Sequence, residues 1–186
     1  MDTFFFNLTS AQAATFLGAL GVFAGVAMIA IPEATRAFLI GFGRNRTAAW
    51  ILAAVDLLWA AWLVYHTPME RLGFLKPALY PAVPIAFYLI ITYMDDLLAT
   101  RALGGLLLLM ANPILLCMRW LDTDWRYLPI VLAYVWAVAG MALVLSPYIW
   151  RRWAAPLLKS NARCRAVGIL KLVGGALFLW LARQVF

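Results

Sequence analysis

The sequence predicts an all-α membrane protein, a polytopic bundle of about six transmembrane helices in one integral membrane domain, residues 1–186. Of its 186 residues, 66% are apolar or aromatic and only 12% are charged, whereas about a quarter of the residues in a soluble domain are charged. The apolar residues also fall into segments that match the roughly 17 to 25 residues needed for one helical crossing of a bilayer. Composition therefore excludes a soluble enzyme, a DNA-binding module, a disordered tail and a disulfide scaffold.

The first two predicted spans form a hairpin over residues 11–65. The first span covers 11–31 and ends at Pro32, which cannot continue a helix. The N-terminus before it has an acidic residue and no Lys or Arg, so it lacks the positive region of a cleavable signal peptide. We therefore expect this span to remain in the mature protein. The second span covers 47–65 and contains one charge, Asp56.

The central hairpin, residues 78–118, is the least certain part of this division. Its two segments are separated by a brief polar stretch that includes the acidic pair Asp95 and Asp96, so they form either two crossings or one long broken helix. Prolines inside both segments free backbone carbonyls that either line a cavity or merely accompany a kink. The segments and their unusual residues are 78–94 with Pro81 and Pro84, and 102–118 with Asn112 and Pro113.

The last hairpin covers residues 127–183. Its first span, 127–146, ends at a proline, Pro147, like the first span of the chain. Its second span, 164–181, contains Lys171. Residues of the bilayer core should be apolar, so Lys171 is unusual in the same way as Asp56.

The basic residues favour six crossings over five. With six, one side of the membrane holds nine of them: Arg36, Arg44, Arg46, Arg101, Arg151, Arg152, Lys159, Arg163 and Arg165. The other side holds five: Arg71, Lys76, Arg119, Arg126 and Arg183. Because cytoplasmic loops are enriched in Lys and Arg, both termini are expected outside the cytoplasm. We read the net charge of +7 as contact with anionic lipid headgroups and not with nucleic acid.

A shift of 115 residues, which carries Pro32 onto Pro147, aligns the first hairpin with the last. Each unit is a helix, a proline, a basic linker and a second helix, so the chain contains either a parallel internal repeat or a chance match of Ala- and Leu-rich segments. Both linkers combine arginines with bulky apolar side chains, which is typical of segments that lie at the membrane interface. The candidate lipid-interface residues are Arg36, Arg44, Arg46, Trp150, Arg151, Arg152 and Trp153.

The second copy resembles a known family. The run from Gly140 to Trp153, followed by Arg163, Arg165, Gly168 and the pair Gly174–Gly175, resembles the YjeT-like family of small bacterial inner-membrane proteins. The resemblance covers about residues 139–183. It implies a location in the bacterial inner membrane and assigns no catalytic residue.

Asp56 and Lys171 are the two charges that lie within predicted spans. A charge at bilayer depth costs about 2.5 to 3.5 kcal/mol on insertion scales, so it should face protein, water or a partner. The 115-residue shift aligns the two residues, which predicts an intramembrane ion pair. Either this pair is structural and fixes which helices pack together, or one of its members belongs to an ion or proton path.

The sequence leaves two candidate functions open. Motifs for a nucleophile with its base, a phosphate loop or a metalloprotease are missing, and the single histidine and two separated cysteines suggest no metal or cofactor site. We therefore expect a non-enzymatic accessory subunit that packs in the bilayer against a larger membrane complex, or against itself. The alternative is a small transporter or channel that works as a homo-oligomer. Its polar lining would include Asp56, Lys171, Asp95, Asp96 and Asn112.

Overall fold

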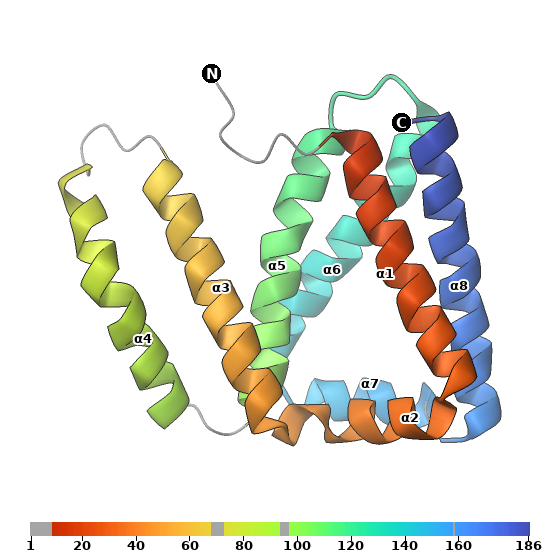
Figure 1. Cartoon of the computed structure of the whole chain (residues 1–186), viewed down its shortest axis with the longest axis horizontal. Helices are drawn as coiled ribbons and strands as arrows, with labels where there is room; N and C mark the ends of the chain where they lie inside the picture. The colour runs from red at the N-terminus through yellow and green to blue at the C-terminus, as the bar shows by residue number, and fades with distance from the viewer. Residues whose placement is uncertain (1–8, 68–72, 94–96, 158) are drawn as a thin grey trace.

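The computed structural model describes residues 9–67, 73–93, 97–157 and 159–186, and every regular element in them is helical (Figure 1). This confirms the predicted all-α class. Three short 3-10 helices accompany the α-helices: η1 (Phe42–Arg44), η2 (Gly73–Ala78) and η3 (Asp124–Arg126). The α-helices are α1 (Ser10–Ala30), α2 (Pro32–Gly41), α3 (Arg46–His66), α4 (Leu79–Tyr93), α5 (Leu98–Met118), α6 (Tyr127–Leu145), α7 (Ile149–Leu157) and α8 (Asn161–Gln184).

Five of these helices, α1, α3, α5, α6 and α8, are long and apolar enough to cross a bilayer. Helices α3 and α5 begin side by side, because Ala49 near the start of α3 shares a core cluster with Leu98 and Ala99. The chain between them must therefore return across the same thickness. It does so through η2 and α4, which runs antiparallel to α3 in Figure 1.

The returning segment explains why α4 is short. Its 15 residues rise only about 22 Å at 1.5 Å per residue, against a hydrocarbon core of about 30 Å. The six residues of η2 add about 12 Å at 2.0 Å per residue. Segments 78–94 and 102–118 are thus separate antiparallel helices and not one broken helix.

Local sequence signals set the helix boundaries. Thr9 and Gln12 form a capping box at the start of α1, with the Gln12 amide donating to the Thr9 hydroxyl over 3.2 Å. Side chains of Asn45 and Ser160 accept amide hydrogen bonds at the starts of α3 and α8. Pro32 occupies the first position of α2, where its missing amide hydrogen costs nothing. Each of these signals therefore marks the start of a helix.

The two copies of the predicted repeat have the same local structure. Helices α1 and α6 end 115 residues apart, at Ala30 and Leu145, and α3 and α8 begin 115 residues apart. The residues that close α1 and α6 share an unusual conformation, φ −129° and ψ 63° at Ile31 and φ −137° and ψ 75° at Ser146. Figure 1 shows both units descending to the same face and returning, so the copies are parallel.

Both basic linkers are helical. Helices α2 and α7 lie beside each other across the ends of the spans, at one face of the bundle (Figure 1). We call this the linker face. The opposite face carries the start of α1 and the end of α8, where Ala13, Ala14 and Leu17 share a core cluster with Phe178 and Ala182.

Helices that are adjacent in the sequence are not the main packing partners in the outer hairpins. Helix α1 packs along α8, while α3 and α6 pack on either side of α5. Glycines allow the close approach: a Cβ atom on Gly21 would lie 2.9 Å from the Cα atom of Gly175, and one on Gly104 would lie 2.8 Å from the Gly140 carbonyl oxygen. The two helices of each hairpin, 11–65 and 127–183, are therefore neighbours in the sequence but pack mainly against helices outside their own hairpin.

The bundle exposes a large apolar surface. Its accessible area is 11,964 Å², roughly a third more than the about 8,900 Å² expected for a compact monomer of this mass. Several aromatic residues near the ends of the spans are exposed, as headgroup-level residues should be. They are Trp50, Tyr65, Trp120, Trp125, Tyr127, Tyr148 and Trp153. The shape therefore depends on lipid or on other chains to cover the spans.

Candidate functional site

Asp56 lies on the side of α3 that faces α5. A Cβ atom on Gly105 of α5 would lie 2.7 Å from Asp56 Oδ2, so the missing side chain at Gly105 makes room for the carboxylate. Its other oxygen, Oδ1, is buried without a hydrogen-bond partner in the part of the chain that the structure describes. A carboxylate oxygen in apolar surroundings is costly unless it is paired or protonated. Asp56 therefore needs a proton, a water molecule or a cation.

Lys171 lies elsewhere. Its backbone carbonyl approaches Gly21 of α1, at 3.2 Å from a Cβ atom built there, while the side chain is exposed on α8. Among the described residues no salt bridge joins Lys171 to Asp56, so the predicted intramembrane ion pair is wrong. The physical reason is the packing: α8 lies along α1, whereas Asp56 of α3 is turned toward α5. Equivalent positions in two repeats have similar depth, but depth does not make them neighbours.

A second polar group, the Arg101 side chain, lies at the start of α5, although the predicted spans placed it in a loop. Arg101 belongs to the first turn of the helix, and its Nε is buried without a hydrogen-bond partner among the described residues. It precedes Gly105 by four residues and hence shares its side of α5. Hydropathy could not reveal this placement, because the predicted span began only at residue 102.

Asn112 extends this side of α5. It follows Gly105 by seven residues, or two helical turns, and is exposed. Helices α3 and α5 diverge away from the linker face in Figure 1, which leaves this part of α5 uncovered by α3. Three polar groups thus follow one another along this side of α5. They are Arg101, the carboxylate that Asp56 of α3 places against Gly105, and Asn112. The predicted acidic pair, Asp95 and Asp96, lies outside the described residues.

The candidate lipid-interface residues gather at the linker face, where they have two kinds of surroundings. Arg36 Nη1 donates to Asn161 Oδ1 over 2.6 Å, which ties α2 to the start of α8. Trp150 Nε1 donates to the Leu39 carbonyl over 2.9 Å, which ties α7 to α2. The other five, Arg44, Arg46, Arg151, Arg152 and Trp153, are exposed on this face. The face is therefore both a packed junction of helices and a basic surface.

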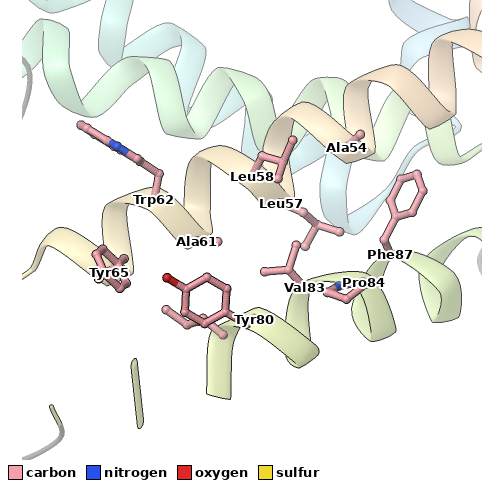
Figure 2. Close-up of a pocket in the computed structure, with 11 residues that line it drawn as sticks. Ala54, Leu57, Leu58, Ala61, Trp62, Tyr65, Tyr80, Val83, Pro84 and Phe87 are labelled. Carbon is pink, nitrogen blue, oxygen red and sulfur yellow. The ribbon is translucent and has the colours of Figure 1, made fainter. Parts of the chain in front are cut away.

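A groove lies between α3 and α4 (Figure 2). Its volume is about 520 Å³, and all eleven residues that line it are apolar or aromatic, with Leu57 and Val83 at its centre. Tyr65 and Tyr80 stand at the end away from the linker face, with ring centroids 6.5 Å apart. The Lys76 ammonium lies 5.7 Å from the Tyr65 ring centroid. This groove could not be predicted from the sequence, because its lining does not differ in composition from other apolar faces.

The remaining chemistry of the described residues is sparse. No three His, Cys, Asp or Glu side chains in the described ranges are placed to hold a metal ion. Both cysteines are free, and Cys164 is buried beside the carbonyls that close α1. The polar groups of interest are therefore those on α3, α5 and α8.

Comparison of the chain with protein-family models, with curated proteins and with solved structures finds no match. The resemblance of residues 139–183 to the YjeT-like family stays a prediction. Function must accordingly be argued from the geometry alone.

Proposed function

We propose that the protein is a non-enzymatic integral membrane subunit that packs in the bilayer against a larger membrane complex. The observation that carries this proposal is the exposed ammonium group of Lys171 in the middle of α8. Lys171 is the eleventh residue of this helix and lies about 15 Å along it, half of a hydrocarbon core of about 30 Å. Its side chain is exposed and joined to no carboxylate among the described residues.

An exposed lysine at this depth favours association with another chain. Placing it against lipid costs about 2.5 to 3.5 kcal/mol on insertion scales, and a carboxylate or carbonyl group of another chain would offset that cost. The large exposed apolar surface points in the same direction, because subunits of membrane complexes bury such faces against one another. A bacterial inner membrane with both termini outside the cytoplasm is part of the same proposal.

Substitution of Lys171 tests this role. We expect the wild-type chain, extracted in a gentle detergent, to elute with foreign subunits at constant stoichiometry, and Lys171→Met to elute without them while keeping its helical content. Lys159→Met removes the same charge at the linker face and should keep the complex. A wild-type chain that elutes as a pure homo-oligomer or monomer would contradict the subunit role.

A transporter or channel is the second candidate, and the polar side of α5 favours it. Arg101, the Asp56 carboxylate and Asn112 form a discontinuous polar line through otherwise apolar helices, with unpartnered atoms at Asp56 Oδ1 and Arg101 Nε. In purified proteoliposomes, ion flux that is lost in Asp56→Asn would favour this candidate over the subunit role. If protein-free vesicles show the same ion flux as the proteoliposomes, the transporter or channel function is excluded.

A further inference from the structure

The groove between α3 and α4 has the dimensions of one lipid acyl chain. Its lining on α3 extends from Ala54 to Tyr65, twelve residues whose eleven steps cover about 16 Å along the helix axis. One leaflet contributes half of a hydrocarbon core of about 30 Å, or about 15 Å. The groove therefore spans a single leaflet, from mid-membrane to the surface opposite the linker face.

The chemistry of the groove changes along its length. Leu57, Val83 and Phe87 line its inner part, where they offer only dispersion contacts (Figure 2). Tyr65 and Tyr80 stand at its outer end, and both are exposed, at 44% and 73%. Tyrosines at this level place an apolar ring against acyl chains and a hydroxyl among headgroups.

A positive charge stands at the same end. Lys76 in η2 holds its ammonium group over the Tyr65 ring, 5.7 Å from the centroid. The His66 ring also packs against Tyr65, edge to face, with the ring centroids 5.3 Å apart. An ammonium can bind a phosphate by charge and by hydrogen bonds, and basic pockets between membrane helices bind anionic headgroups.

We propose that this groove is a binding site for one anionic phospholipid, with an acyl chain between α3 and α4 and the phosphate at Lys76. The ligand is a membrane lipid and not a free phosphate or a small anion, because neither of these would fill the long apolar part of the groove. The bound acyl chain also fills the space between α3 and α4. This proposal goes beyond the subunit role and does not depend on it.

Retention of lipid by the purified protein tests the site. The full chain would be reconstituted in vesicles of equimolar phosphatidylglycerol and phosphatidylethanolamine, extracted in mild detergent, and examined by native mass spectrometry. We expect about one retained phosphatidylglycerol per chain and severalfold less phosphatidylethanolamine. Equal retention of both lipids, or no retained lipid, would overturn the proposal.

Two pairs of variants separate the groove from its headgroup site. Ala61→Phe fills the groove and should reduce retention at least fivefold, whereas Val138→Phe adds the same ring at an exposed position of α6, 62% exposed in the wild type, and should not. Lys76→Glu should abolish the preference for phosphatidylglycerol, whereas Lys159→Glu makes the same charge change at the linker face and should preserve it. Equal behaviour of the two members of either pair would refute the site. Because Lys76 lies outside the spans, its variant tests the site even if Ala61→Phe does not fold.

Discussion

Two neighbouring glycines of α8 have opposite surroundings. A Cβ atom on Gly175 would lie 2.5 Å from the Val22 amide nitrogen and 2.8 Å from the Gly18 carbonyl oxygen of α1. A Cβ atom on Gly174 would meet nothing within 4 Å. Backbone cannot move aside as a flexible side chain can, so only one member of the pair is required for the contact between α1 and α8.

Alanine substitution of these two glycines should therefore have opposite effects. Gly175→Ala forces α1 and α8 apart, and we expect it to lower the free energy of unfolding by about 1 to 3 kcal/mol, the usual cost of overpacking. Gly174→Ala should be neutral or stabilising by up to about 1 kcal/mol, because alanine favours the helix. Denaturation in mixed detergent micelles, followed by circular dichroism, measures both. Equal losses in the two variants would contradict the α1–α8 contact.

At the scale of elements, the two linker helices join the outer spans to each other. Trp150 of α7 donates its indole hydrogen to the Leu39 carbonyl of α2 and packs against Phe42, with ring centroids 5.5 Å apart. Trp153, one helical turn away, is 45% exposed at the linker face. The same residue type thus fixes one helix to another in the first case and is free to anchor a helix among lipid headgroups in the second.

Phenylalanine substitution separates these two roles. Trp150→Phe keeps a ring against Phe42 but removes the donor to the Leu39 carbonyl, so we expect it to destabilise the fold by about 0.5 to 1.5 kcal/mol. Trp153→Phe should leave stability in detergent unchanged and reduce binding to vesicles instead. Thermal unfolding in detergent gives the comparison. A loss of stability in Trp153→Phe as large as that in Trp150→Phe would show that α2 and α7 do not pack as described.

The helix boundaries could be predicted from the sequence because their signals are local. Predicted spans 11–31 and 127–146 end within one residue of α1 and α6, where the chain meets Pro32 and Pro147. The start of α5 was missed by four residues, because Arg101 interrupts the hydropathy although it lies within the helix. Short-range chemistry thus reveals where a helix ends, but a charged first turn conceals where one begins.

At the scale of the whole molecule, the choice of packing partners could not be predicted. Spans of this chain have similarly apolar faces, so composition does not distinguish α1 beside α8 from α1 beside α3. The glycines at 18, 21, 104 and 175 lie at close contacts between helices, but the sequence does not show which helix each one meets. For this reason the structure does not pair Asp56 with Lys171 as predicted. For the same reason the groove between α3 and α4 could not be predicted.

The arrangement also makes the orientation testable. The starts of α2 and α7 share the linker face, which carries nine basic residues, and the two termini of the described bundle lie at the other face (Figure 1). By the positive-inside rule we expect the linker face to be cytoplasmic. Alkaline phosphatase, active only outside the cytoplasm, should be active when fused after Phe186. Green fluorescent protein, which folds in the cytoplasm, should be dark there.

Charge reversal at the linker face supplies the control for this orientation. Replacing Arg36, Arg151 and Arg152 by Glu removes three of the nine positive charges and adds three negative ones, so inserted chains should become mixed in orientation and phosphatase activity at Phe186 should fall severalfold. Replacing Arg119, Arg126 and Arg183 by Glu at the opposite face should preserve or increase that activity, because it enlarges the difference in charge between the two faces. Full fluorescence at Phe186 in the unmodified chain would show that the basic surface of α2 and α7 faces outward, and the anionic lipid proposed for the α3–α4 groove would then be drawn from the cytoplasmic leaflet.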